Sequence, residues 1–217
     1  MLNSDFFALD PCQVAINLLG KIIQHKVNHS WLSARIIETE AYYLEDKASH
    51  ASLGYTEKRK ALFMPSGTIY MYYARGGDSL NVSCLGDGNA VLIKSAIAEP
   101  LSDKGMLDIM QNNNPRKDNK LRDHNRLCSG QTLLCKSLGI TVKQWDKKVF
   151  HPDKFRIIAD HYAPQQIIKT KRLGIPIGRD EHLFYRFIDK TYANCCTQNP
   201  LSKRSSLVNV DYFILNV

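Results

Sequence analysis

The sequence predicts a single α+β domain in which most strands pair in antiparallel fashion. Three observations support this fold class. The 217 residues contain no linker rich in proline, serine or glycine, and a chain of this length can bury a substantial core in one domain. Short strand-like stretches follow one another through tight turns, as in antiparallel hairpins. Segments with legible caps and an apolar stripe predict helices around these strands.

The first half of the chain gives the clearest elements. A helix is predicted to start with Asp10 as its N-cap and Pro11 in its first turn, and to stop at Gly20. Two strands joined by three polar residues predict a hairpin, and three more separated by glycine-containing turns predict a meander with a charged tip. These five strands are expected at about 21–27, 31–43, 68–73, 79–84 and 90–97.

The second half is less informative. A helix is predicted near 102–111, and a second one from Ser129 as N-cap to Gly139 as its stop. Further strands are predicted at about 155–159, 165–171 and 183–188. The tail, 194–217, mixes polar and apolar residues and receives no assignment, so residues 1–217 are treated as one domain.

Composition narrows the functional class. A net charge of +8 and a pI near 9.2 favour a polyanionic partner such as nucleic acid. No apolar run approaches the roughly 20 residues of a membrane-spanning helix, and the N-terminus lacks the pattern of a secretory signal. Six cysteines without a Cys-x-x-Cys spacing suit a reduced intracellular protein. His124, Cys128 and Cys135 lack a second clustered pair, so no metal site is predicted.

The stretch RIIETEAY, residues 35–42, carries the most suggestive chemistry. Glu38, Glu40 and Tyr42 stand two residues apart, so on a strand all three share one face. The simplest alternative is a strand that faces solvent with two hydrated carboxylates.

Downstream residues add candidates, each with a structural alternative. Residues 44–65 lose periodicity and predict a long functional loop, which contains His50 and the basic run Lys58, Arg59 and Lys60. A buried, hydrogen-bonded histidine and a solvated charge run are the alternatives. Lys94 lies within an apolar strand and either reaches the surface or lines a pocket.

Four linked motifs together resemble one family. They are IIETEAYYLEDKASHAS, FMPSGTIYMYY, LNVSCLGDGNAVLIKSAIAEPL and LCSGQTLLCKSLGI. In order and spacing they are similar to the alkyladenine, or 3-methyladenine, DNA glycosylases of mammals and many bacteria. The resemblance covers about residues 5–197. It implies a curved, mainly antiparallel sheet with flanking helices, and a protruding hairpin that inserts into the DNA minor groove.

The resemblance also implies an activity and its residues. Glu40 matches the catalytic carboxylate, Tyr42, His50 and Tyr72 match the aromatic walls of the base pocket, and Asn81 matches an asparagine that disfavours guanine. The expected enzyme is monofunctional. It flips alkylated purines such as 3-methyladenine out of double-stranded DNA and hydrolyses the N-glycosidic bond with a water activated by glutamate, leaving an abasic site for base excision repair.

Further expectations come with the resemblance. Neither a metal nor another cofactor is needed, and the expected protein is a monomer in the bacterial cytoplasm that associates with the nucleoid when it acts. Lys58, Arg59 and Lys60 are expected to contact DNA phosphates. Whether the neutral bases hypoxanthine and ethenoadenine are also removed stays open.

Three positions depart from the family pattern. Lys94 stands where the family has an arginine that helps to position the water, and Gln131 replaces a proline. The hairpin tip, ARGGD, is one residue short and lacks the tyrosine that fills the gap left by the flipped base. Arg75 falls nearest that position, with Tyr73 as the alternative. These departures raise a second hypothesis, a nucleic-acid-binding relative with weakened catalysis. A metal-dependent hydrolase, the third, lacks a ligand set.

Overall fold

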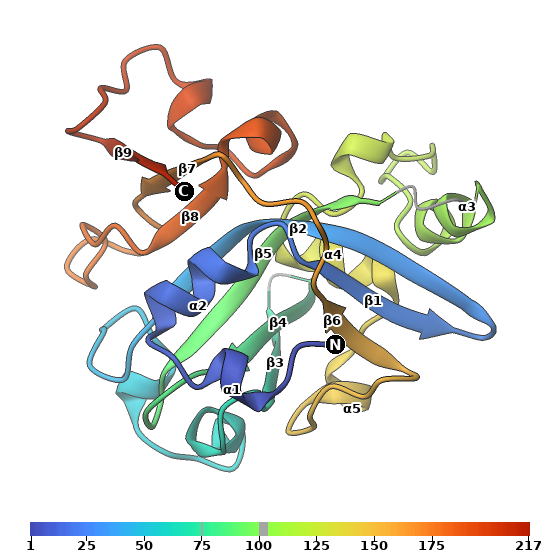
Figure 1. The fold of residues 1–217 in the computed structure, drawn as a ribbon, viewed down its shortest axis with the longest axis horizontal. Coiled ribbons are helices and arrows are strands. Elements are labelled where there is room, and N and C mark those ends of the chain that lie inside the picture. The colour runs from blue at the N-terminus through green and yellow to red at the C-terminus, as the bar shows by residue number, and fades with distance from the viewer. Residues whose placement is uncertain (75, 100–103) are drawn as a thin grey trace.

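A single sheet organises the chain in the computed structural model, which describes residues 1–74, 76–99 and 104–217. Every strand pairing in this part of the chain is antiparallel (Figure 1). The strands are β1 (Ile22–Val27), β2 (Ser30–Tyr42), β3 (Ile69–Ala74), β4 (Gly77–Ser83), β5 (Ala90–Ala98), β6 (Phe155–Ile158), β7 (Gln166–Thr170), β8 (Arg186–Asp189) and β9 (Tyr212–Asn216).

The long strand β2 is the axis of the sheet. The strand order is β3-β4-β5-β2-β8-β7-β9, with β1 paired to β2 and β6 paired to β1. One edge of β2 pairs with β5 from Ala34 to Tyr42. The other edge pairs with β1 over its first half and with β8 at Glu38–Glu40. Strand β2 therefore joins two arms of the sheet, and its second half lies between β5 and β8.

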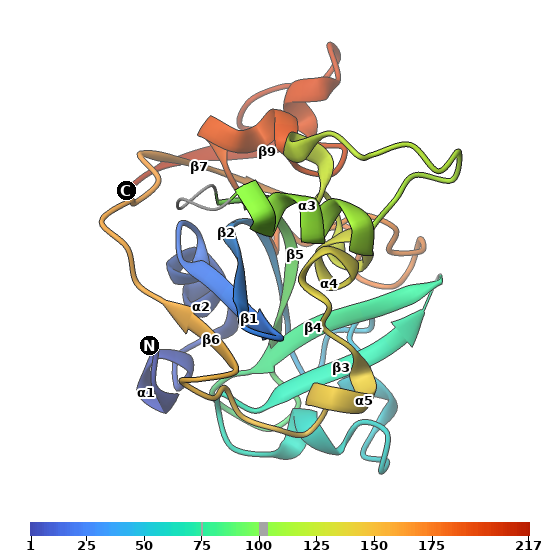
Figure 2. The same ribbon diagram turned by 90° about the vertical axis from the view of Figure 1, so that its right-hand side faces the viewer.

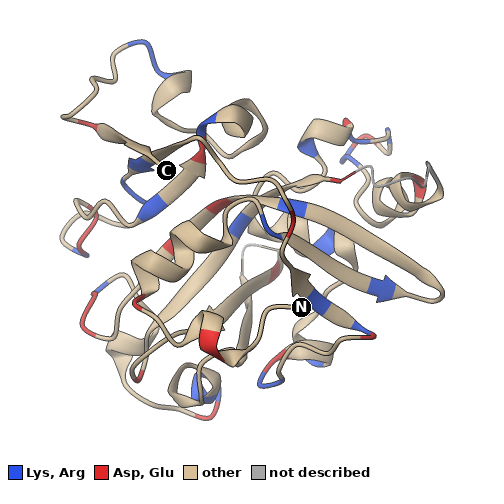
Figure 3. Ribbon diagram, viewed as in Figure 1, with Lys and Arg blue, Asp and Glu red and all other residues tan. Residues whose placement is uncertain are grey.

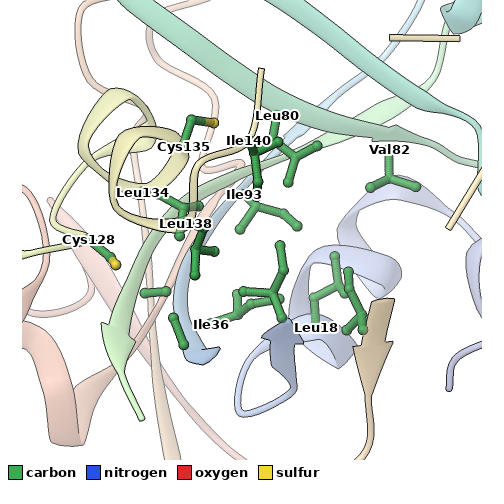
Figure 4. Close-up of a cluster of buried hydrophobic side chains, with 14 of the residues drawn as sticks. Leu18, Ile36, Leu80, Val82, Ile93, Cys128, Leu134, Cys135, Leu138 and Ile140 are labelled. Carbon is green, nitrogen blue, oxygen red and sulfur yellow. The ribbon is translucent and has the colours of Figure 1, made fainter. Parts of the chain in front are cut away.

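The main core packs helices against this sheet. The helices are α1 (Ser4–Phe7), α2 (Pro11–Leu18), α3 (Lys104–Asn113), α4 (Gln131–Leu138) and α5 (Val142–Trp145). Apolar residues of α2 and α4 meet strand residues in one buried cluster, where Leu18, Leu134 and Leu138 surround Ile36 and Ile93 (Figure 4). Burying this apolar area is the dominant stabilising term, and it holds β2 and β5 in place.

The predicted long loop between β2 and β3 is ordered by a small core of its own. It contains two 3₁₀ turns, Ala51–Leu53 and Lys60–Phe63. Buried Ala51 and Leu62 pack with Tyr70 of β3 and Ala90 of β5. The loop is thereby fixed over the end of the sheet where β2 stops.

The β3–β4 hairpin extends away from the body of the molecule (Figure 2). Its strands pair from Ile69↔Val82 to Ala74↔Gly77. Arg75, one of the two candidates for filling the DNA stack, lies outside the described residues. Tyr73, the other candidate, is 70% exposed.

The predicted α+β class, the first hairpin and the meander β3-β4-β5 are confirmed. Ser129 is not the N-cap of α4. Gly130 has that position, at φ 105°, a left-handed conformation that glycine adopts without strain. The helix predicted at 102–111 is α3, observed from Lys104 to Asn113, while 102 and 103 lie outside the description. The unassigned tail supplies β9, the edge strand beside β7.

Candidate active site

Glu38, Glu40 and Tyr42 share one face of β2, as the spacing predicts. On the opposite face, Thr39 donates a hydrogen bond to the Ala15 carbonyl of α2, and Ala41 lies in the main core. Two β-bulges interrupt the pairing of β2 with β5. One leaves a residue of β2 unpaired between Ile36 and Glu38, and the other leaves a residue of β5 unpaired next to the partner of Glu38. Such bulges re-aim side chains. The solvent-facing alternative is wrong, because both carboxylates are fully buried.

Glu40 is a buried carboxylate with two close partners. Its Oε2 accepts a hydrogen bond of 2.7 Å from the Tyr42 hydroxyl, and its Oε1 lies 3.3 Å from Nζ of Lys94. Burial alone would raise the pKa of Glu40, but the positive charges of Lys94 and Arg186 and the bond from Tyr42 outweigh it and lower the pKa. Glu40 is therefore ionised at neutral pH.

A cavity of about 410 Å³ opens above this carboxylate. Lys94 and Tyr42 line it and separate it from Glu40. Of the two alternatives for Lys94, the structure shows the pocket. The other predicted base-binding residues, His50, Tyr72 and Asn81, line the same cavity. A volume of this size is typical of small-molecule sites.

Three aromatic rings make one wall. The ring centroids of His50 and Tyr72 lie 4.5 Å apart, and Nδ1 of His50 is 2.8 Å from the hydroxyl of Tyr70. Partial burial, together with the charges of Arg59 and Arg179, lowers the pKa of His50, so its imidazole is neutral at pH 7. Asn81 pairs directly with Tyr70 across β3 and β4, and its Nδ2 donates to the Tyr70 carbonyl at 3.2 Å.

Sequence reasoning missed several residues of this site. Tyr70, which no sequence motif singled out, lines the cavity. The segment 173–176 lines it as well, and Arg179 of the following turn donates to the Lys47 carbonyl. Arg172 lies 4.5 Å from the centre of the Tyr42 ring and forms a buried ion pair with Asp46. These contacts join residues more than a hundred positions apart, so no local pattern could indicate them.

The basic run lies apart from the cavity. Lys58 and Lys60 are exposed, whereas Arg59 donates two hydrogen bonds to the carbonyls of Leu53 and Gly54. Arg59 therefore has a structural role within its own loop. Other lysines and arginines recur along the whole ribbon (Figure 3).

Neither a metal cluster nor a membrane helix is evident in the described part of the chain. No three His, Cys, Asp or Glu side chains are grouped so as to hold a metal ion there. Cys128 and Cys135, considered as ligands above, are buried in the main core, while His124 is exposed. None of the helices in residues 1–74, 76–99 and 104–217 is long and apolar enough to cross a membrane.

Comparison with known proteins shows which family the chain belongs to. The model of the methylpurine-DNA glycosylases matches residues 5–193. The chain belongs to the methylpurine-DNA glycosylase family. A protein of Pseudomonas savastanoi pv. phaseolicola named "Putative 3-methyladenine DNA glycosylase" is 57% identical over 99% of this chain and 97% of its own length. Proteins of the same name from Pseudomonas aeruginosa UCBPP-PA14 (55%, 99% and 90%) and Koribacter versatilis (33%, 83% and 86%) are also similar.

The family match contains the whole cavity. Its residues run from Tyr42 to Arg179, inside the matched range. The last residues, including β9, lie beyond the family model, but the Pseudomonas methylpurine-DNA glycosylase relatives align with almost the entire chain. The segment that forms β9 thus lies within the part of the chain that aligns with those relatives.

Proposed function

We propose that the protein is a monofunctional DNA glycosylase that excises 3-methyladenine from double-stranded DNA and leaves an abasic site. The observation that carries this proposal is the buried, ionised Glu40 beneath a cavity walled by neutral aromatic rings. The proposal agrees with the family, and with the name of the Pseudomonas relatives. The protein acts as a monomer and uses no metal.

In this proposal, the aromatic walls of the cavity recognise the base. A target base inside a duplex is inaccessible, so its nucleotide must rotate out of the stack. Tyr42, His50 and Tyr72 then hold the base between ring faces. Alkylated purines are cations, and a positive charge near electron-rich ring faces is favourable. Because His50 is neutral, it does not repel such a base.

Glu40 does the chemistry in this proposal. Cleavage of the N-glycosidic bond leaves positive charge on the sugar, which the carboxylate stabilises. A water molecule adds to C1′, Glu40 takes its proton, and the cationic purine departs as a neutral base. Oε1 of Glu40 faces Nζ of Lys94, and in this proposal the attacking water binds beside them. Lys94, 3.3 Å away, keeps the carboxylate ionised between turnovers.

Specificity and DNA contact come from the neighbouring strands. The side chain of Asn81, fixed by its bond to Tyr70, crowds the position that the amino group of guanine would take. The projecting β3–β4 hairpin inserts into the minor groove, where Tyr73 or Arg75 fills the gap left by the flipped base. Lys58 and Lys60 contact phosphates.

Replacing Glu40 tests the proposal. Glu40→Gln keeps the shape of the side chain but cannot accept the proton, so excision of 3-methyladenine should be abolished while binding to the damaged duplex stays nearly intact. Single-turnover rates with enzyme in excess, followed by alkaline cleavage of abasic sites, measure this.

Glu45→Gln, in the exposed loop after β2, is the matched control and should leave the rate unchanged. A Glu40→Gln rate within about threefold of the unmodified protein, a barrier change well under 1 kcal/mol, would sink the assignment. An unmodified protein that binds but never cleaves would instead favour the non-catalytic relative.

A further inference from the structure

A second buried carboxylate lies two residues before Glu40. Glu38 has no exposed surface, and its Oε1 accepts a hydrogen bond of 2.7 Å from Nε of Arg186. The hydroxyl of Thr197 donates to the same oxygen at 2.6 Å, and the Thr197 amide donates to Oε2 at 3.1 Å. Ser95 also donates to Oε2. Glu38 is thus fully hydrogen-bonded by three segments of the chain, so it has no capacity left for a substrate.

Arg186 stands directly opposite Glu40 and yet binds Glu38. The β2–β8 register pairs Glu40 with Arg186 and Glu38 with Ile188. The guanidinium therefore reaches along the sheet to the neighbouring carboxylate, while its Nη2 donates to Thr197 and to the Gln198 carbonyl at 3.0 and 2.9 Å. Arg186 is 1% exposed, so its planar fork is held in one orientation.

Stability alone does not account for this arrangement. Taking two charges out of water costs about as much as their attraction returns, and buried ion pairs can often be replaced by neutral side chains without loss of stability. Arg186 pairs with Glu40 in the β2–β8 register while its guanidinium binds Glu38 on the same face of β2, and this placement indicates a role toward Glu40.

We propose that Arg186 is a positioning residue for Glu40. Anchored by Glu38, Thr197 and Gln198, its guanidinium fixes the β2–β8 register beneath the cavity and stabilises the negative charge of Glu40. This inference rests on the proposed function, in which Glu40 is the catalytic group. It assigns a task to Glu38 as well, which orients the guanidinium and never meets the substrate.

Other groups that face Glu40 or its partners come from four elements. They are Lys94 of β5, Tyr42 of β2 itself, Tyr72 of β3, and Arg172, which follows β7 and contacts Tyr42. Burial is the largest single influence on Glu40 and raises its pKa, but Lys94, Arg186 and the hydrogen bond from Tyr42 together outweigh it, so the pKa is lowered. Removing the charge of Arg186 must therefore make Glu40 easier to protonate.

A paired substitution tests the role without stranding a buried charge. Glu38→Gln combined with Arg186→Gln removes one charge of each sign and keeps amides that can bond to Thr197 and Gln198. The matched control is Arg35→Gln combined with Glu99→Gln, a second largely buried pair on β2, 2.9 Å apart. Two readouts are followed: the ¹³C NMR titration of the Glu40 carboxylate, assigned with Glu40→Gln, and the pH profile of single-turnover excision of 3-methyladenine, whose nucleoside keeps its positive charge throughout the acid range.

We expect the Glu40 titration and the acid limb of the rate to lie at higher pH in Glu38→Gln/Arg186→Gln than in Glu38→Gln alone, because these two variants differ only in the charge of residue 186, and we expect the Arg35/Glu99 control to move neither. Arg186→Lys, which keeps the charge, should return the titration toward that of the unmodified protein. An unmoved titration and rate profile, with only a lowered melting temperature, would overturn the role of Arg186. A Glu40→Gln variant that still excises would overturn the proposed function instead, and the NMR titration would still decide between a positioning and a purely structural Arg186.

Discussion

At the scale of single residues, two histidines show how environment sets protonation. His50 is neutral because of partial burial and nearby arginines, and it faces the cavity. His25 is neutral because the residue is only 5% exposed, and burial lowers the pKa of its imidazole. Its Nδ1 donates to the Leu138 carbonyl at 2.7 Å, and its Nε2 accepts from the indole of Trp145 at 3.1 Å. A second proton on His25 would place two donors face to face.

This geometry makes stability depend on pH. Burial lowers the pKa of His25 below the ordinary value of 6.5, so the unfolded chain binds a proton that the folded protein refuses. Below about pH 6.5 the free energy of unfolding should fall by up to about 1.4 kcal/mol per pH unit from this group. Urea unfolding between pH 7.5 and 5, compared with His25→Gln, isolates the effect. Parallel stability curves for the two proteins would contradict it.

Residue spacing predicted part of the site. It could not predict the contacts between segments that are far apart in the sequence. Alternation along β2 placed Glu40 and Tyr42 on one face, because a strand has a period of two. The same rule could not show that Glu38 is buried against Arg186, which lies 148 residues later. The local motifs carried the family resemblance, whereas Arg172 and Arg186 reach the site only through the pairing of β7 and β8.

At the scale of elements, the β3–β4 hairpin is braced near its turn. The backbone of Gly77, the first residue of β4 and the partner of Ala74 in the outermost strand pair, lies against α4 so closely that a Cβ there would stand 2.1 Å from Cγ2 of Thr132. Only glycine permits this approach, so the outer end of the hairpin is held against α4.

This contact predicts a compensating pair of substitutions. Gly77→Ala should lower the free energy of unfolding by about 1–3 kcal/mol through overpacking, and Thr132→Ala should restore much of that loss by removing the opposing methyl group. Chemical denaturation of the two single variants and the double variant measures the coupling.

The matched control is Gly76→Ala in the same turn. Gly76 has φ 80° and open space around it, so an alanine there is strained by its backbone alone. Thr132→Ala should not restore the free energy of unfolding of the Gly76→Ala variant. If Thr132→Ala restored the free energy of unfolding of both glycine variants equally, the close contact at Gly77 would not be the cause of the loss.

Predicted elements were most accurate where turns and caps are explicit, as at Asp10, whose side chain accepts from two backbone amides. The predictions failed where the backbone conformation of a residue determines where an element begins. Gly130 caps α4 because its positive φ turns the chain, while the hydroxyl of Ser129 has no partner in the described structure. Strand β9 escaped notice because its burial depends on β7, not on its own alternation.

At the scale of the whole molecule, positive charge is spread widely, and only some of it is free to meet DNA. Lys58 and Lys60 are exposed in the loop over the cavity end of the sheet, while Arg59 between them is engaged with carbonyls. The long-range attraction to DNA is therefore expected from the two lysines of this run and not from all three residues.

Reversing these two charges should weaken binding to damaged and undamaged duplex alike. Lys58→Glu with Lys60→Glu should also reduce the slope of log affinity against log salt by about 2, because each phosphate contact contributes about 0.9. Fluorescence anisotropy across a salt series measures the slope. Lys203→Glu with Arg204→Glu, exposed residues between β8 and β9 near the opposite end of the sheet, is the control. Identical slopes for the two double variants would show that Lys58 and Lys60 are solvated and do not contact DNA phosphates.

The order of strands along the chain also controls when activity can appear. β2 carries Glu38 and Glu40 early, but the arginine that binds Glu38 and stands opposite Glu40 is on β8, and Thr197 follows later still. A chain emerging from the ribosome can pair β2 with β5 long before β8 exists, and until then Glu38 lacks its partner Arg186. The buried pair is thus completed only when about nine tenths of the protein has been synthesised. A nascent or truncated chain would retain the motifs of the family and lack the buried ion pair of Glu38 and Arg186.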